Sequence, residues 1–308
     1  MDNTSLPPSF GSMDQEEQIW EDEVTNASLS AFPVNCTFRA SMLHQRQFHS
    51  HSGFELYLCL SGTGSYIAGG KLYDLGPGAW IAVRPNALHI SRPAADVPFH
   101  RFVLAVEESY LNSLGEQDEA ISVWMRPWLP EPGQHAKYRR LDAQRLLIVQ
   151  ETLTQLELEQ KLRSPGYPLM VKSLLLKLFA DLNRHTGRAE PLPPSDASRD
   201  HKQLIERILA YLMEHYREPL PADRLCRHFN LSRSHLFLLF KRHTGATLNG
   251  FVVTYRLNKA KELLQTTRLP IIEIAAASGF QDVSHFCHTF KREVGRTPTQ
   301  YRATHGLL

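Results

Sequence analysis

The amino-acid sequence predicts a two-domain α+β protein, in which an all-β barrel with attached helices precedes an all-α domain. Short apolar runs separated by Gly and Pro fill residues 32–106, a pattern typical of antiparallel barrels and sandwiches. From residue 140 onward, apolar residues recur at helical spacing. The length of 308 residues is sufficient for about two domains, each with its own core.

The composition indicates a globular chain whose C-terminal part is basic. Hydrophobic residues make up 42% of the chain and charged residues 21%, which is ordinary for a folded protein. Residues 201–308 carry 16 Lys and Arg against 8 Asp and Glu, whereas residues 1–200 carry 18 against 24. This asymmetry favours a polyanionic partner, such as nucleic acid, for the C-terminal part.

The cysteines and the N-terminus indicate a cytoplasmic protein. Cys36, Cys59, Cys226 and Cys287 include no C-x-x-C pair, which fits reduced thiols better than disulfides or a zinc site. Residues 1–27 are acidic where a signal peptide needs a basic start. No apolar run approaches the roughly 18 residues of a membrane span. We therefore expect a cytoplasmic location and no contact with a membrane.

The first two thirds of the chain divide into a tail, a domain and a linker. Residues 1–27 are polar and are expected to be a disordered tail. The strands of the barrel and two helices, at residues 140–162 and 168–183, are assigned to one domain, 28–186. The helices either cap the barrel or pair with those of a second copy, which favours a homodimer. Residues 187–200, with three prolines, have the composition of an interdomain linker.

The C-terminal domain, residues 201–308, contains one helical unit twice. Ser234-His235-Leu236 and Phe240-Lys241-Arg242 recur 50 residues later as Ser284-His285-Phe286 and Phe290-Lys291-Arg292. A short helix and a turn precede each copy, which is the arrangement of a helix-turn-helix motif. The sequence therefore predicts two such motifs in one domain.

A long helix joins the two units. Residues 248–266 would span roughly 28 Å as a helix, which can set two recognition helices about one DNA turn apart. The first helix of the domain is expected to begin at Asp200 as its N-cap, with Gln203 as its capping-box partner. We expect seven helices in this domain.

Residues 256–302 closely resemble the signature of the AraC/XylS family of bacterial transcription regulators. The matching residues are Arg256, Ala260, Leu263, Leu264, Ile274, Ala275, Gly279, Phe280, Ser284, Phe286, Phe290, Lys291, Gly295, Pro298, Tyr301 and Arg302. The resemblance implies a sequence-specific DNA-binding regulator that is not an enzyme and needs no cofactor. It also implies RNA polymerase as a partner and activation of transcription, commonly of carbohydrate-use genes.

The resemblance also implies which residues meet DNA. Base edges are approached from the outward positions of the recognition helices, namely Ser234, Phe237, Leu238, Ser284, Cys287 and His288. Phosphates are approached by the basic residues Arg233, Lys241, Arg242, Lys291 and Arg292. Because the family usually has polar residues at the positions of Phe237 and Leu238, we expect Ser284 and His288 to carry more of the base reading.

The segment that begins at His49, HSHSGFELYLCLSG, resembles the first motif of cupin barrels. The resemblance implies that four residues match a metal-binding tetrad, namely His49, His51, Glu55 and His89. Three imidazoles and a carboxylate suit a divalent transition metal. A cupin-like sensor domain of an AraC-type regulator is the second interpretation, with these residues binding a small polar effector such as a sugar. The third is that the histidines are structural.

We expect the effector pocket, without a metal. Tyr57 shares strand parity with Glu55, so that the two side chains face the same side of a regular strand. Arg39, Trp80 and Arg84 are further candidates for the pocket on the basis of their chemistry. Two alternatives stay open: a metal-dependent cupin enzyme with a DNA-binding tail, and a DNA-binding protein that responds to no effector.

Overall fold

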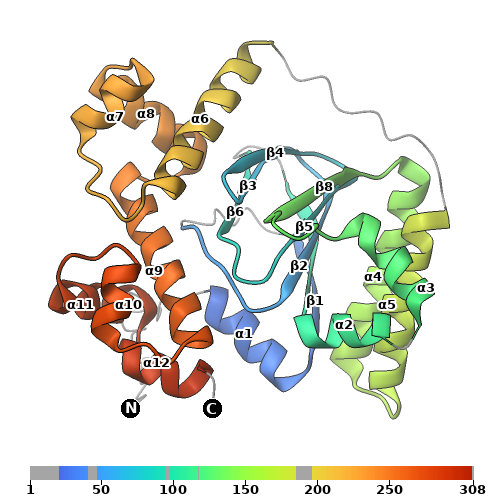
Figure 1. Cartoon of the computed structure of the whole chain (residues 1–308). Helices are drawn as coiled ribbons and strands as arrows, with labels where there is room; N and C mark the ends of the chain where they lie inside the picture. The colour runs from blue at the N-terminus through green and yellow to red at the C-terminus, as the bar shows by residue number, and fades with distance from the viewer. Residues whose placement is uncertain (1–20, 41–46, 95–97, 117, 185–195, 307–308) are drawn as a thin grey trace, which may run out of the picture.

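The protein consists of a β-rich domain and a helical domain that lie against each other (Figure 1). The structure, a computed structural model, describes residues 21–40, 47–94, 98–116, 118–184 and 196–306. Within these ranges, no helix is both long and apolar enough to span a membrane. The predicted fold class is confirmed: the N-terminal domain is built on two β-sheets and the C-terminal domain is all helical.

Two antiparallel sheets form the β-rich domain. The strands are β1 (Val34–Ala40), β2 (Phe54–Ser61), β3 (Gly64–Ala68), β4 (Lys71–Leu75), β5 (Ala79–Val83), β6 (His89–Pro93), β7 (His100–Val106) and β8 (Ala136–Arg140). The larger sheet has the order β1-β7-β2-β5-β8 and the smaller one the order β4-β3-β6. The strand at 136–140 precedes the first long helix, which therefore begins later than the sequence pattern predicted.

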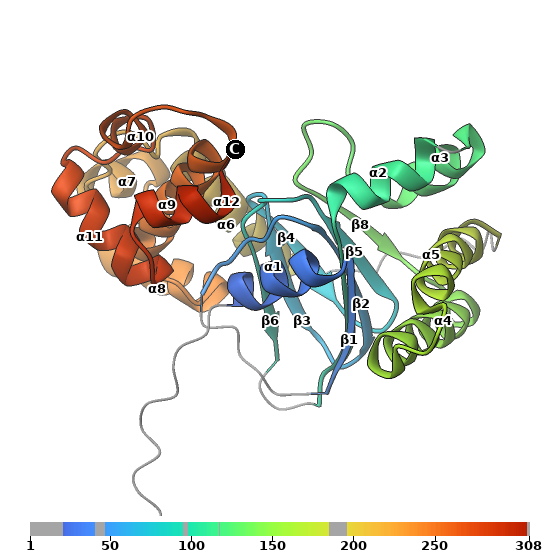
Figure 2. The same ribbon diagram turned by 90° about the horizontal axis from the view of Figure 1, so that it is seen from below.

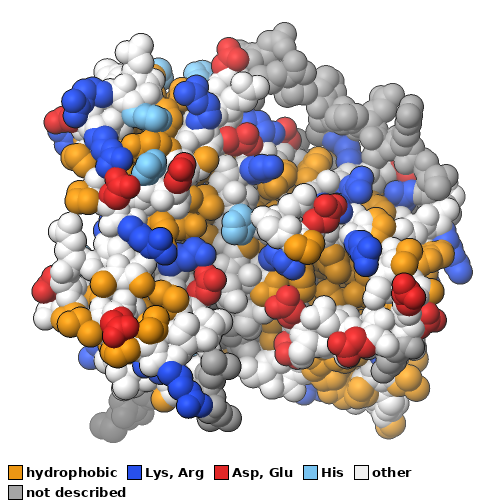
Figure 3. Space-filling model, viewed as in Figure 1, with side chains coloured by type: hydrophobic (Ala, Val, Ile, Leu, Met, Phe, Trp, Pro, Cys, Tyr) orange, Lys and Arg blue, Asp and Glu red, His pale blue; other side chains and the backbone are white. Residues whose placement is uncertain are grey.

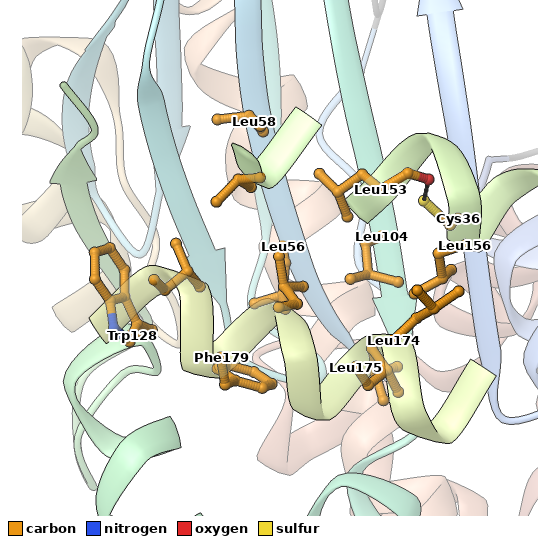
Figure 4. Close-up of a cluster of buried hydrophobic side chains, with 14 of the residues drawn as sticks. Cys36, Leu56, Leu58, Leu104, Trp128, Leu153, Leu156, Leu174, Leu175 and Phe179 are labelled. Carbon is orange, nitrogen blue, oxygen red and sulfur yellow. Dashed lines mark hydrogen bonds between the residues drawn. The ribbon is translucent and has the colours of Figure 1, made fainter. Parts of the chain in front are cut away.

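Strand alternation gives the larger sheet two different faces. Leu56 and Leu58 of β2 pack against the helices α4 (Ala143–Leu162) and α5 (Tyr167–Arg184), together with Leu153 and Phe179 (Figure 4). The intervening residues Tyr57 and Cys59 point the other way, into a cluster that includes residues of the smaller sheet. This second face is the interior of the barrel.

Further helices pack in two places, on the helix-covered face of the larger sheet and against its N-terminal edge strand β1. The first group is α2 (Glu108–Glu116), α3 (Glu119–Met125) and the short 3₁₀ helix at Arg126–Trp128. The N-terminal edge is covered by α1 (Glu21–Ala31). Its first residues lie in the tail that was predicted to be disordered, and that prediction is wrong for residues 21–27. The helix is held because Leu29 is buried and the Asn26 side chain accepts hydrogen bonds from Ser52.

Seven helices make up the C-terminal domain in the described residues, as predicted. They are α6 (Asp196–Glu214), α7 (Ala222–Phe229), α8 (Arg233–Thr244), α9 (Leu248–Thr266), α10 (Ile271–Ala277), α11 (Val283–Val294) and α12 (Pro298–His305). The first of these begins at Asp196, so the prediction that Asp200 is its N-cap is wrong. Nothing in the segment 196–199 opposes a helix, since it contains neither Gly nor Pro, and the helix extends into the predicted linker.

The two domains share one apolar cluster. Ile67 and Leu88 of the barrel pack with Ile208 and Leu209 of α6 and with residues of α8 and α9. Polar contacts join the same surfaces, since the Glu206 carboxylate accepts a hydrogen bond from the Leu72 amide at 2.8 Å. In both views the helical domain lies beside the smaller sheet (Figures 1 and 2). The smaller sheet is therefore the surface that the barrel presents to the helical domain.

Candidate DNA interface and effector pocket

The two recognition helices have the same beginning and the same end. Helix α8 is capped by Ser232, whose hydroxyl accepts from the His235 amide, and α11 by Asp282, whose carboxylate accepts from the His285 amide at 2.6 Å. Both end at a glycine in the left-handed region, Gly245 and Gly295. The 50-residue offset of the two predicted units is therefore confirmed in the helices themselves.

Each recognition helix buries one apolar face. Leu236, Leu239 and Phe240 are buried in α8, and Phe286 and Phe290 are buried in α11. Phe240 packs into the cluster shared with the barrel, whereas Phe286 and Phe290 belong to a separate cluster of the second unit. The two units thus have separate cores, and of these two apolar clusters the one that also contains barrel residues is that of the first unit.

The outward residues of α11 are polar and accessible. Ser284, His288, Lys291 and Arg292 are exposed and Cys287 is half-buried. The Arg292 guanidinium forms an ion pair with Glu293 at 2.6 Å. This surface offers hydrogen-bonding groups and positive charge, which are the groups that read base edges and contact phosphates.

The outward surface of α8 is different in character. Ser234, Lys241 and Arg242 are exposed, but Leu238 is 70% exposed with no polar group to offer a base. Phe237 is half-buried against the core, and the Arg233 guanidinium lies 5.8 Å from its ring centroid. On the face seen in Figure 3, basic and histidine side chains gather over α6, α7 and α8. The exposed surface of α8 therefore combines basic side chains with the apolar side chain of Leu238.

The helix α9 is fixed between the two units. Its Arg256 side chain donates to the backbone carbonyls of Tyr216, at 2.6 Å, and Glu218, at 2.9 Å, beyond the end of α6. Gly279 follows α10 with φ of 89°, and a Cβ atom there would lie 2.9 Å from the Arg217 backbone. Arg256 and Gly279 therefore hold the second unit against the first, so that α9 can act as a rigid spacer.

Inside the barrel, three histidines surround one carboxylate. The Nε2 atom of His51 lies 3.1 Å from Glu55 Oε2, and that of His89 lies 3.5 Å away. The opposite ring nitrogens, Nδ1, donate to the carbonyls of Gly53 and Ala87, so that both Nε2 atoms are directed at Glu55. His49 lies beside His89 with a centroid distance of 4.2 Å. The structure thus brings together all four residues of the cupin-like pattern.

The electrostatics of this cluster centre on Glu55. Burial alone would raise the pKa of the carboxyl group, but the imidazoles of His89 and His51 outweigh burial and hold the pKa well below its ordinary value. Tyr66 Oη also donates to Glu55 Oε1 at 2.6 Å. The Glu55 carboxylate is therefore held by the Tyr66 hydroxyl and lies against the imidazole rings of His51 and His89.

The same cluster has a donor set that could hold a metal ion. One ligand atom from each of His49, Glu55 and His89 lies within 4.8 Å of the others. Two imidazoles and a carboxylate suit a divalent transition metal. The hydrogen bond from His89 Nδ1 to the Ala87 carbonyl would orient the ring so that its Nε2 atom could bind the metal.

The remaining candidates of the pocket separate into two groups. Tyr57 faces the barrel interior and its hydroxyl lies 2.8 Å from that of Ser91, and Arg39 lies on the interior-facing parity of β1. Trp80 faces the helices instead, packed edge-on against Trp128. The Arg84 guanidinium lies over the Phe54 ring outside the barrel. The structure does not bring Trp80 and Arg84 together with Glu55, because strand alternation places them on other surfaces.

Sequence reasoning missed several interior polar residues. Tyr66 and Ser91 bond Glu55 and Tyr57 across the barrel. Arg101 is only 2% exposed and is the second residue of β7, before the apolar run 102–106. A charged residue within the run 99–106 was a usable signal for Arg101, whereas the partners of Glu55 and Tyr57 depend on the pairing of distant strands.

The histidine cluster lies directly against the DNA-binding domain. His49 and His89 form an isolated β-bridge, and Ser50 and Asn86, which flank it, both bond the side chain of Asn258 in α9. A small cavity of about 40 Å³ at this point is lined by His49 and by residues of α9 and α11. The pocket candidates and the spacer helix are thus separated by a single layer of residues.

Comparisons with known proteins identify both domains. The profile described as the AraC-like ligand binding domain matches residues 32–179, and that of a helix-turn-helix domain matches residues 225–304. The chain is 27% identical over 286 residues to the HTH-type transcriptional activator RhaR of Cronobacter sakazakii, covering 92% of this chain and 96% of that protein. It is 28% identical to RhaR of Escherichia coli K12, covering 82% and 86%.

The chain is also similar to solved structures of other proteins. The DNA-binding domain of AdpA, in complex with a target DNA, is 28% identical over 32% of this chain and 88% of that chain, with a TM-score of 0.31. ToxT of Vibrio cholerae O395 is 13% identical over 90% of this chain and 99% of that chain, with a TM-score of 0.34. On the profiles of both domains and the full-length relatives, this chain belongs to the AraC/XylS family of helix-turn-helix transcription regulators.

Proposed function

We propose that this protein is a cytoplasmic activator of transcription that responds to a small polar effector, such as a sugar, and controls carbohydrate-use genes. Its full-length relatives are transcriptional activators, which supports the direction of regulation. Helices α8 and α11 would bind promoter DNA, and RNA polymerase would be the partner that activation requires. The effector would bind among His49, His51, Glu55, Tyr57 and His89 inside the barrel.

The observation that carries this proposal is the contact between the histidine cluster and α9. Asn258 is 6% exposed and bonds both segments that carry the histidines, through Ser50 and Asn86. A molecule that displaced His49 or His89 would also displace these partners. Because α9 sets the spacing of the two recognition helices, such a displacement would change the geometry that DNA meets.

The physical mechanism would be linkage between two equilibria. An effector that binds one arrangement of the domains better than another shifts the population toward that arrangement. By reciprocity, DNA that prefers the same arrangement raises the affinity for the effector by the same factor. Coupling free energies of about 1–3 kcal/mol are typical and would change operator affinity by roughly 5- to 150-fold.

We also propose that the protein is a homodimer formed through α4 and α5. Leu147, Leu158 and Leu162 lie along one exposed stripe of α4, with Leu158 52% and Leu162 63% exposed. Leu169 and Met170 at the start of α5 are exposed beside them. An apolar stripe of this kind is typical of a helix that packs against a partner, and a second copy of the pair would cover it.

The test uses the full-length protein and the promoters of the genes that flank its own gene. Operator affinity is measured by mobility shift with and without a panel of sugars, and transcription is measured in a reporter strain. We expect one sugar to change operator affinity at least about fivefold and to raise reporter output. An operator affinity that no sugar alters, with a reporter that stays constitutively on, would instead support the regulator that needs no effector.

The alternative that this protein is a metal-dependent enzyme has a test of its own, because His49, Glu55 and His89 form a donor set that could hold a metal ion. Elemental analysis of the full-length protein purified without chelator measures bound metal per chain. About one zinc, iron or manganese ion per chain would favour a metal centre. Less than about a tenth of an ion per chain, in a protein that still responds to a sugar, would favour the effector pocket.

A further inference from the structure

One end of the barrel interior carries three arginines on a single level of the larger sheet. Arg39 is paired with Arg101 between β1 and β7, and Arg101 with Cys59 between β7 and β2. On the other side of β2, Ala79 of β5 is paired with Arg140 of β8. The Gly78 amide donates to the Cys59 carbonyl, which places this part of β5 beside Cys59. In the order of the strands β1, β7, β2, β5 and β8, this level contains Arg39, Arg101, Cys59, Ala79 and Arg140.

All five positions have the parity of the barrel interior. Cys59 and Ala79 are buried in the interior cluster. Two positions along their strands, Val103 and Tyr138 pack against that cluster, and alternation therefore directs Arg101 and Arg140 to the same face. Cys59 confirms the proximity: burial raises its pKa to about 12, and the charges of Arg101 and Arg140 both oppose this rise.

Two of these arginines, Arg101 and Arg140, each have a buried guanidinium nitrogen for which the described residues provide no acceptor. Arg101 is buried, and its Nη1 atom and that of Arg140 have no hydrogen-bond partner among the described residues. Arg101 contacts the Phe99 ring, 5.7 Å away, but an aromatic face replaces only part of the lost hydration. The carboxylate of Glu55 belongs to the histidine cluster, four residues away along β2, or roughly 13 Å.

A buried guanidinium nitrogen without an acceptor is unfavourable, because it loses its hydration without a compensating hydrogen bond. Arginine cannot lower this free-energy cost by deprotonation, because its guanidinium group stays protonated in proteins. An anion with several acceptor oxygens would lower the cost, and the planar guanidinium group matches the geometry of a carboxylate or phosphate group. The side chains of Cys59 and Ala79, which lie between Arg101 and Arg140 on this level, are small.

We infer that the effector is an anion, whose carboxylate or phosphate group binds at the level of Arg101 and Arg140. The inference rests on the proposed function and narrows it, from a polar molecule to an acidic one. Tyr57 and Ser91 lie next to this level toward Glu55, and their hydroxyls would contact the neutral part of the molecule. A sugar acid has both kinds of group on one ring.

The test compares matched ligands on the full-length protein by thermal unfolding and calorimetry. D-galacturonate and D-galactose differ only in the group at C6, and D-galactose 6-phosphate and inorganic phosphate test the second type of anion. The variants are Arg101→Met, which keeps the length of the side chain without its charge, and Arg139→Met as the control. Arg139 is exposed and adjacent to Arg140 on the opposite face of β8.

We expect at least one of the anions to raise the unfolding midpoint of the wild type by several degrees more than chloride at equal ionic strength. Its affinity should exceed that of galactose by at least about tenfold. Arg139→Met should keep both effects and Arg101→Met should lose them. Whether the carboxylate or the phosphate compounds act more strongly identifies the group that the site prefers.

The inference is overturned if no anion distinguishes the wild type from Arg101→Met. It is also overturned if Arg101→Met lowers the midpoint by several degrees in chloride alone, as the loss of an already paired arginine would. Operator binding is measured for both proteins without ligand. Since this measurement does not depend on the anion, a failure of DNA binding would contradict the proposed function and not the anion site.

Discussion

Asn258 of the spacer helix α9 donates a hydrogen bond from Nδ2 to the backbone carbonyl of Asn86 in the barrel, at 2.9 Å. Asn86 has a left-handed backbone with φ of 61°, and its amide donates to the carbonyl of His51. A single side chain of the DNA-binding domain is therefore two hydrogen bonds away from the histidine cluster. The same side chain also accepts a hydrogen bond from Ser50, which lies between His49 and His51 in the sequence.

Replacing Asn258 with Ala should uncouple effector binding from DNA binding. The variant loses the bonds to Ser50 and Asn86, so we expect the effector-induced change in operator affinity to fall to less than a third of the wild-type change. Mobility shifts with and without effector measure it. Asn249→Ala, at an exposed position of the same helix, is the control and should respond normally. An Asn258→Ala protein with an unaltered response would exclude this path.

His288→Ala and Lys291→Ala should affect DNA binding in different ways. The loss of a base contact by His288 should cost roughly 1–3 kcal/mol on the specific site and less on scrambled DNA. Lys291 is expected to contact phosphate, so its loss should weaken both DNAs equally and reduce the salt slope by about one. Titrations at several salt concentrations measure both. Equal losses on specific and scrambled DNA for His288→Ala would remove it from the base-reading residues.

The double change His49→Ala, His51→Ala should abolish the effector response and leave operator binding intact. The pocket loses two of the imidazoles around Glu55, whereas the recognition helices have their own caps and cores. A reporter strain and a mobility shift measure the two properties. His100→Ala is the control, because His100 packs on Phe38 outside the barrel. A double variant that still responds would place the effector elsewhere.

The Glu55 carboxylate should stabilise the barrel in a pH-dependent way. Its pKa in the folded protein is lower than its ordinary value of 4.5, so its contribution is complete above that pH and is lost as the pH falls through the folded pKa. Glu55→Gln should lower the free energy of unfolding at pH 7 by about 3 kcal/mol, because the imidazoles of His51 and His89 lose the buried carboxylate that they contact. The difference from the wild type should shrink below pH 4.5. Denaturant titrations of both proteins between pH 3 and pH 7, in ~1-unit steps, measure this difference in unfolding free energy. A difference that does not change with pH would contradict the lowered pKa of Glu55.

The combined change Leu158→Glu, Leu162→Glu should convert the dimer into monomers. Both leucines are exposed on α4, so the charges should not disturb the fold but should oppose burial against a second copy. Sedimentation velocity measures the mass of the particle. The exposed apolar Ile272 of α10 provides the control, since Ile272→Glu should stay dimeric. A wild-type protein that sediments as a monomer at micromolar concentration would refute the interface.

Much of the helical domain could be predicted from the sequence, because its signals are local. The 50-residue repeat, the spacer helix 248–266 and the inward positions of both recognition helices all follow from periodicity and turn residues. The start of α6 and the helix α1 could not be placed in this way. Helix α1 depends on contacts with distant residues, such as that between Asn26 and Ser52, whereas α6 simply extends further toward the N-terminus than the N-cap signal indicated.

The sequence by itself determined the order of the domains, the repeated DNA-binding unit and the four residues of the cupin-like pattern, because each is written in a continuous stretch or a fixed spacing. The tertiary structure decided which polar residues share the barrel interior. Strand pairing brings Tyr66 to Glu55, and Arg39 and Arg140 to the level of Arg101, and no spacing along the chain encodes these pairings. It also decided that Asn258 meets the histidine-bearing segments, since packing between domains is set by shape and burial and not by local sequence.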